Sequence, residues 1–397
     1  MRSTLAAILL VTLTPLSNAA PRGDLAEPTA RADGDWRIES ARMRFSAFFQ
    51  DGEGYQSQDG PVTGPGGEKL TVWQPNLEFT VRQDDHWRHD VAVSVDIVTA
   101  ASPDAVDATS SSSRENEAAS VEVTTHATPT AHDLWALRYG VHVEEHLYSG
   151  SVGVAYTRSV ADDNASIGAS LNAVVDRYKE FLPDGTKHGW TGRSGLNGNV
   201  SLTQILSRTT LGALTYGVTL QQGTLQQTWN SVPAESAADA PKPFARRREL
   251  LPDHRWRHAF DGEVAQHIPL TASTARAGYR FYFDDFGVLA HTGSFTLYQY
   301  FGPRFYLRAA YRYHHQTGID FFTTLVRRDV DAGRYVAADS DLDAFGAHDV
   351  GLKALYYLHP LGRLSGGLDY VDVSYSRYVR TNGLHVDVGA AGYGRSF

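Results

Sequence analysis

Polar and apolar side chains alternate along residues 304–316, and the same alternation recurs along most of the chain. Successive side chains of a strand point to opposite faces, so a strand with this pattern has one polar and one apolar face. The polar set here is Arg304, Tyr306, Arg308, Arg312, His314 and Gln316, and the apolar set is Phe305, Leu307, Ala309, Tyr311 and Tyr313. A chain built from many such strands must turn its polar faces to water and its apolar faces to lipid or to a core.

The connections between the alternating segments differ in length in a regular way. The segments number sixteen, at residues 36–50, 68–82, 86–100, 119–127, 132–143, 147–159, 164–177, 194–205, 209–223, 255–268, 273–284, 289–301, 304–316, 345–358, 363–379 and 384–397. The even-numbered connections are tight turns, and most carry the Gly, Pro or Asp that turns require. The five long connections are all odd-numbered, at 51–67, 101–118, 178–193, 224–254 and 317–344. Outer-membrane barrels have short periplasmic turns and long extracellular loops, so this parity predicts a transmembrane antiparallel up-and-down β-barrel of about 16 strands.

A soluble barrel or sandwich is the alternative fold, because it would place the apolar faces inside. The unequal loops argue against it, and so does the C-terminal Phe397, the residue type that outer-membrane assembly machinery prefers on a last strand. Tyr393 shares the face of Phe397 in the alternation, but Arg395 and Asp387 lie on it too. The last strand is therefore the least regular one.

The N-terminus resembles a secretory signal peptide at residues 1–19. Arg2 is followed by an apolar run and then by the small residues Ser17 and Ala19 that precede cleavage. We expect a short N-terminal periplasmic segment at 20–35 and the barrel at 36–397. No later segment approaches the roughly 18 consecutive apolar residues of a membrane helix. The net charge of −9 disfavours nucleic acid as a partner, while 20 Tyr, 17 Phe and 7 Trp suit both strands and membrane interfaces.

Four stretches resemble an uncharacterised family of Gram-negative outer-membrane β-barrel proteins, known only as a domain of unknown function. They are residues 96–104, 138–141, 279–286 and 311–322, with the sequences DIVTAASPD, RYGV, YRFYFDDF and YRYHHQTGIDFF. They are spread over roughly residues 45–357, so the resemblance covers most of the chain after the signal peptide. It implies a porin-like barrel and an outer-membrane location, and it implies no activity.

Charged and tyrosine residues gather on the polar faces of a few strands. Intramembrane charges face inward and pair, so these residues can line a permeation path or can pair and fill the interior. Both interpretations stay open, with Asp349 as a further acid and Asp284 at the outer rim. The predicted lumen residues are Arg276, Arg280, Tyr282, Arg304, Arg308, Arg312, His314, Lys353, Glu78 and Asp96.

The sequence offers one candidate group for a metal site. His142, Glu144 and His146 alternate on one face and could ligate a divalent metal, although their spacing is not diagnostic. No Ser, His and acid can be placed together, so we predict no catalytic residues and no cofactor. The run at 246–248 is three arginines, which could meet lipopolysaccharide phosphates or could simply be solvated.

Three functions are compatible with these features. The first is a channel or conduit for a small polar or anionic solute or a partner segment. The second is a filled barrel that acts as the scaffold of an envelope complex, and the third is an outer-membrane enzyme with a site at the rim. The expected partners are outer-membrane lipid and lipopolysaccharide, the outer-membrane assembly machinery and an envelope protein.

Overall fold

The computed structural model describes residues 36–54, 64–66, 69–101, 116–181, 186–226, 230–240, 242–328, 333–359 and 369–397. Among these residues, no helix is long and apolar enough to cross a membrane. The sequence-based assignments that lie outside them are the signal peptide at 1–19, the segment at 20–35 and the start of a predicted strand at 363–368.

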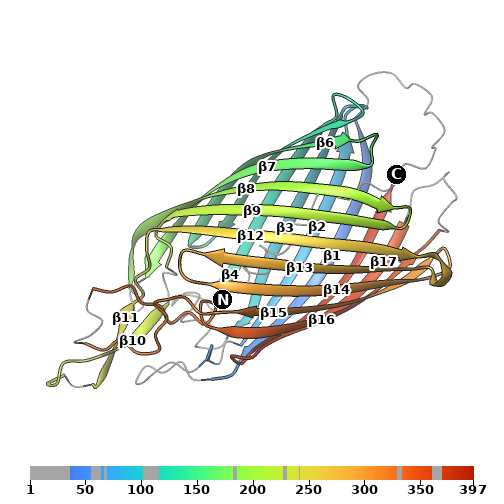
Figure 1. Ribbon diagram of the computed structural model, residues 1–397. Coiled ribbons are helices and arrows are strands. Elements are labelled where there is room, and N and C mark those ends of the chain that lie inside the picture. The colour runs from blue at the N-terminus through green and yellow to red at the C-terminus, as the bar shows by residue number, and fades with distance from the viewer. Residues whose placement is uncertain are drawn as a thin grey trace.

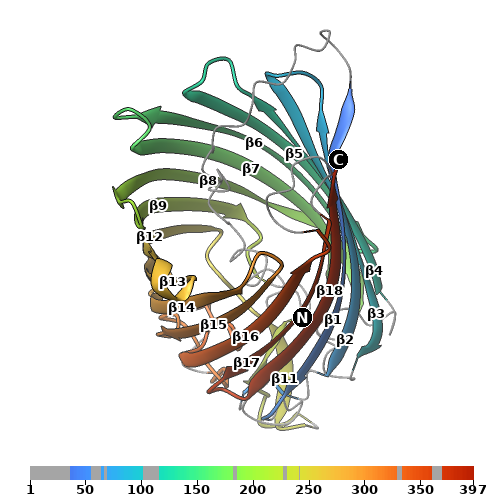
Figure 2. The ribbon, with the colours of Figure 1, turned by 90° about the vertical axis from the view of Figure 1, so that its right-hand side faces the viewer.

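Sixteen antiparallel strands close into one barrel (Figure 1). Each strand pairs with the barrel strands that precede and follow it, and β1 pairs with β18 to complete the ring (Figure 2). The strands are β1 (Arg37–Gly52), β2 (Leu70–Arg82), β3 (Trp87–Ala101), β4 (Asn116–Ala127), β5 (Asp133–Glu144), β6 (Leu147–Val160), β7 (Ala165–Phe181), β8 (Lys187–Ser207), β9 (Thr210–Gly223), β12 (His254–Ile268), β13 (Ser273–Asp284), β14 (Leu289–Phe301), β15 (Phe305–Gln316), β16 (Phe345–Tyr357), β17 (Asp369–Arg380) and β18 (Leu384–Ser396). The predicted fold class and strand count are confirmed.

The main departures from the predicted boundaries lie at the end of the barrel that carries the long connections, which we call the loop end. The opposite end, with the short connections and Phe397, is the turn end. β7 and β8 extend to Phe181 and from Lys187, beyond the predicted limits of 177 and 194. Backbone pairing continues there after the polar and apolar alternation stops, so hydropathy alone could not mark where these strands end.

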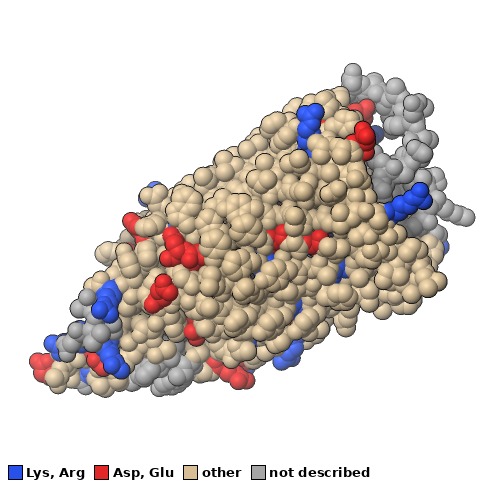
Figure 3. Space-filling model, in the orientation of Figure 1, with Lys and Arg blue, Asp and Glu red and all other residues tan. Residues whose placement is uncertain are grey.

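The two faces of the strands have the predicted character. On β5, the outward residues Trp135, Leu137, Tyr139, Val141 and Val143 are all exposed, and on β16 Leu352 is 61% exposed. The opposite face of each strand is inside the closed ring and carries most of the charged residues. Few Lys, Arg, Asp or Glu side chains interrupt the barrel wall in the view of Figure 3. An apolar outer surface and a polar interior are the arrangement of a barrel in lipid.

Two of the long connections contain structure that the sequence did not predict. The connection predicted as a loop at 224–254 contains the hairpin of β10 (Ser231–Glu235) and β11 (Phe244–Arg248), which extends beyond the barrel in Figure 1. It contacts the connection 317–344 through backbone bridges, including reciprocal hydrogen bonds of 2.9 and 2.8 Å between Leu250 and Val336. We call these two connections together the loop-end cap.

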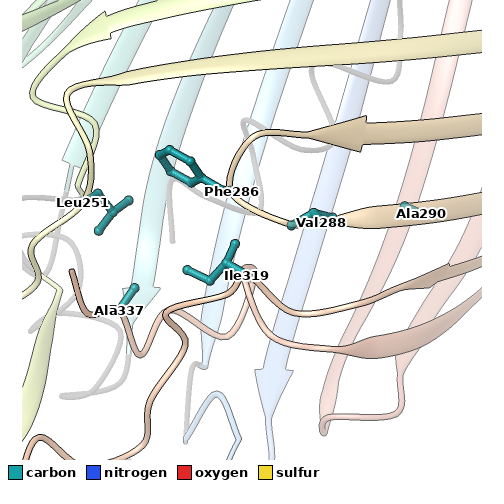
Figure 4. Close-up of a cluster of buried hydrophobic side chains, with 6 residues drawn as sticks. All are labelled: Leu251, Phe286, Val288, Ala290, Ile319 and Ala337. Atoms are coloured by element: carbon teal, nitrogen blue, oxygen red, sulfur yellow. The ribbon is translucent and has the colours of Figure 1, made fainter. Parts of the chain in front are cut away.

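Apolar side chains hold the cap to the barrel rim. One cluster joins the cap to the β13–β14 turn and comprises Leu251, Phe286, Val288, Ala290, Ile319 and Ala337 (Figure 4). A second cluster lies within the cap itself and comprises Val232, Val326, Val336 and Ala338. Burial of these residues explains why segments without strand-like alternation are nevertheless ordered.

The assignment of faces can be tested with two adjacent residues of β16. Leu352→Arg places a charge on the lipid side near the middle of the strand, which should cost about 2–4 kcal/mol of folding free energy in lipid vesicles. Lys353→Leu should cost less, because Asp372, the partner of Lys353 at 3.1 Å, also pairs with Arg44. Urea unfolding followed by tryptophan fluorescence measures both values, and equal losses would contradict the assignment.

Candidate functional site

The predicted lumen residues lie on the inner faces of five strands, with one exception. Arg304 precedes β15 in an exposed turn, where its carbonyl accepts a hydrogen bond from the backbone N–H of Tyr357 at 2.7 Å. The others are Glu78 on β2, Asp96 on β3, Arg276, Arg280 and Tyr282 on β13, Arg308, Arg312 and His314 on β15 and Lys353 on β16. Antiparallel register brings the β13 and β15 sets to the same wall through β14 between them.

Most of these charged side chains have a partner on a neighbouring strand. The pairs are Arg42–Glu78 at 2.9 Å, Arg276–Glu263 at 3.7 Å, Arg280–Asp261 at 3.1 Å and Lys353–Asp372 at 3.1 Å, and Gln74 donates to Asp96 at 2.6 Å. The side chains of Arg280 and Asp261 are nevertheless 43% and 37% exposed. These ion pairs therefore line the inner wall, and their side chains stay partly exposed.

Three inward-facing arginines differ from the rest. Within the described part of the chain, Arg257, Arg308 and Arg312 form no ion pair within 4 Å and no side-chain hydrogen bond, and the buried Nε atoms of Arg257 and Arg308 have no acceptor. Arg308 lies opposite Lys353 in the register, and Arg312 lies opposite Asp349 but beyond ion-pair distance. The three residues follow one wall from the loop end toward the turn end.

The isolation of Arg257 has a local cause. Asp284, its partner in the register, is already saturated. Its Oδ2 accepts from Nε of Arg255 at 3.0 Å and from the hydroxyl of Tyr282 at 2.5 Å, and its Oδ1 accepts from the backbone N–H groups of Phe286 and Val288. The sequence prediction included Tyr282 and Asp284 but missed Arg255 and Arg257, although their odd-numbered positions on β12 place them on the inner face.

Two further arginines that the sequence prediction missed cross the seam where the barrel closes. Arg44 of β1 reaches over β18 to Asp372 of β17, and Nε of Arg42 donates to the hydroxyl of Tyr370 at 2.8 Å. Gly392 of β18 makes room for this crossing, because a Cβ atom there would lie 2.8 Å from the Asp372 carboxylate. These contacts fasten the first strand to the last two on the inner side.

The residues considered for a metal do not converge. Nε2 of His142 and Oε1 of Glu144 are 2.7 Å apart, whereas His146 lies in the next turn with Nε2 3.2 Å from Oε1 of Glu145. In the ranges that the structure describes, no three His, Asp or Glu residues are grouped as a metal site requires. His314 contacts Thr292 at 2.8 Å and Gln316 at 3.2 Å.

The loop-end cap contains one buried carboxyl group. Glu249 is 3% exposed, and its Oε1 accepts a hydrogen bond from the backbone N–H of Ala338 at 2.8 Å, which joins the two connections of the cap. Burial, and after it the nearby Asp339, raises the pKa of Glu249 to about 8.

The run at 246–248 belongs to β11 and is half-buried, and Arg248 pairs with Glu180 of β7. The run is therefore part of the attachment of the cap to the barrel rim.

Comparison with known sequences gives one family match. The profile of a family described as "Protein of unknown function (DUF3570)" matches residues 151–393. No curated protein matches the chain.

Solved outer-membrane structures resemble the chain at low identity. A bacterial polysaccharide outer membrane secretin is 8% identical with a TM-score of 0.47, with 90% of this chain and 98% of that chain covered. A BenF-like porin from Pseudomonas fluorescens Pf-5 is 8% identical with a TM-score of 0.45, covering 91% and 99%. The siderophore receptor PirA from Pseudomonas aeruginosa is 12% identical with a TM-score of 0.40, and the match covers 88% of this chain but 57% of the receptor.

The pKa of Glu249 predicts how the cap responds to pH. Because the folded-state pKa is raised from 4.5 to about 8, the contribution of Glu249 to cap stability is complete at low pH and is lost as pH rises through that interval. Hydrogen–deuterium exchange of the cap is measured in the wild type and in Glu249→Gln at each pH. The ratio of the wild-type rate to the variant rate should be higher at pH 9 than at pH 6.5. A ratio that does not change with pH would contradict the prediction.

Proposed function

The chain belongs to the family described as "Protein of unknown function (DUF3570)", and we propose that this member is an outer-membrane conduit for small polar solutes with a preference for anions. The observation that carries the proposal is the row of unpaired inward arginines, Arg257, Arg308 and Arg312. The three side chains are half-buried on the inner wall, and positive charge there raises the local concentration of anions.

The distribution of charge on the inner wall supports a preference for anions. Asp372 is shared by two cations, Arg44 and Lys353, so this pairing leaves one positive charge over. Arg308 and Arg312 have one acid near them, Asp349, and so add a second positive charge. The chain as a whole is negative, but the field inside a low-dielectric barrel depends on the nearest side chains.

The outer surface supports the proposed location. Apolar side chains ring the barrel, and the turn end carries the exposed Phe397, with the guanidinium of Arg395 5.0 Å from its ring centroid. Lipid is the partner that fits the apolar wall, and the assembly machinery is the partner that fits the terminal strand. We assign the loop end to the cell exterior, as in other barrels with long loops at one end.

The cap favours a second candidate function. Two connections that are folded together present a defined surface rather than separate mobile loops, and such a surface could hold an envelope protein. In that case the barrel would be a scaffold, and its interior would not need to conduct.

The proposal can be tested by neutralising the unpaired arginines together. The triple variant Arg257→Gln, Arg308→Gln and Arg312→Gln should lower the anion-to-cation permeability ratio about threefold in planar bilayers at low salt, where screening is weakest. It should still fold, because none of the three arginines forms an ion pair within 4 Å in the described structure.

The matched control removes one whole ion pair, with Arg280→Gln and Asp261→Asn. This change keeps the net charge of the wall, so the permeability ratio should stay near that of the wild type. A wild-type protein that folds, inserts and never conducts would overturn the conduit and favour the scaffold. A triple variant with unchanged selectivity would overturn the role of the three arginines.

A further inference from the structure

Five tyrosines gather on the inner wall toward the turn end. They are Tyr298 and Tyr300 of β14, Tyr306 of β15, Tyr357 of β16 and Tyr370 of β17, and we call them the tyrosine cluster. Ring centroids are 6.0 Å apart for Tyr298 and Tyr306, 5.4 Å for Tyr300 and Tyr306, and 6.2 Å for Tyr357 and Tyr370. Four consecutive strands thus present phenol rings to the interior at one level of the barrel.

Cationic side chains border the cluster. The guanidinium of Arg276 lies 5.9 Å from the ring centroid of Tyr298, and Arg308 is opposite Tyr298 in the register. Lys353 is the next residue along the same row. Of these cations, Arg276 is paired with Glu263 and Lys353 shares Asp372 with Arg44, so Arg308 is the one that forms no ion pair within 4 Å in the described structure.

The phenol hydroxyls of the cluster differ in their hydrogen bonding. The hydroxyl of Tyr370 accepts from Arg42 at 2.8 Å. In the part of the chain described, the hydroxyls of Tyr298, Tyr300, Tyr306 and Tyr357 have no protein partner. None of these four oxygens is fully buried. Water therefore reaches these hydroxyls, and a polar ligand can replace that water.

Glycine on the last strand shapes the cluster. A Cβ atom at Gly394 would collide with the ring of Tyr370, which lies across β18 at this position. The absence of side chains at Gly392 and Gly394 lets Arg42 and Arg44 approach from β1. The cluster is therefore a built part of the inner wall, with rings and cations set at fixed places.

We propose that the tyrosine cluster and Arg308 bind a sugar acid, a hydroxylated ring that carries a carboxylate. The carboxylate pairs with the guanidinium of Arg308, which is the unpaired donor at the site. The apolar face of the sugar ring packs on the phenol rings, and the sugar hydroxyls hydrogen-bond to the four phenol hydroxyls.

A sugar acid fits better than the other anions that could enter the barrel. An inorganic anion would use Arg308 but not the rings, and an aromatic carboxylate would use Arg308 and the rings but not the free hydroxyls. The inference rests on the proposed conduit, since it names the solute class that the conduit would select.

The test uses glucuronate as the probe and the whole purified protein. Isothermal titration calorimetry in detergent measures binding without any need for conductance, with glucose, acetate and phenylacetate as comparison ligands. Glucuronate should bind most tightly. Arg308→Gln should weaken its binding about tenfold, as expected for the loss of a charged hydrogen bond.

Removal of the tyrosine hydroxyls distinguishes a sugar ligand from an aromatic ligand. The triple variant Tyr298→Phe, Tyr300→Phe and Tyr306→Phe keeps the rings and should weaken glucuronate at least about tenfold while leaving phenylacetate unchanged. Tyr139→Phe, on the outer face of β5, should change neither. Equal affinity for phenylacetate and glucuronate, or insensitivity to the triple variant, overturns the sugar-acid site.

Bilayer recordings keep this inference separate from the conduit itself. If the barrel conducts with anion preference, millimolar glucuronate should reduce the current more than glucose does, and Arg308→Gln should relieve that block. Conductance without any binding of glucuronate by calorimetry would leave the conduit in place and remove the sugar-acid site. Binding without conductance would keep the site and remove the conduit.

Discussion

The structure depends on closure of the sheet between its first and last strands. A backbone N–H or C=O group left unpaired in lipid costs several kcal/mol, so a sheet can span a membrane only when it has no edge. β1 and β18 pair over thirteen positions, from Ser40 with Ser396 to Gly52 with Leu384. On the inner side, Arg42 and Arg44 extend this seam across β18 to β17. The ring that results separates an outer face for lipid from an inner face where charges can remain hydrated.

Local pattern was sufficient to predict the barrel, because neighbouring strands are also neighbours in the chain. A tight turn fixes the register of each hairpin, and the alternation then assigns every side chain to a face. This is why the sixteen strands, the exposed Leu352 and the inward position of Arg308 could be derived from the sequence. Strand ends such as those of β7 and β8 could not, since pairing continues beyond the alternating segment.

The alternation of polar and apolar residues could not predict contacts between distant segments. β10 and β11 are short and contain Pro233, and their burial depends on Val326 and Val336 from another connection. Which arginines lack acids was equally hidden, because Asp284 is saturated by Arg255 and by backbone groups rather than by its register partner, Arg257. The sequence identified the types of residue on the inner wall, and the structure was needed to identify the pairs.

The cap has a consequence for the order in which the molecule assembles. Its two connections flank the four consecutive strands β12 to β15, and they meet through Leu250 and Val336. Those strands form adjacent hairpins, so the cap can form once they are in place, before β1 finds β18. Seam closure has to join segments more than three hundred residues apart, for example Ser40 and Ser396, and long-range pairing of this kind is slow. An open sheet that already carries its folded cap is therefore the expected intermediate on the path to the closed barrel.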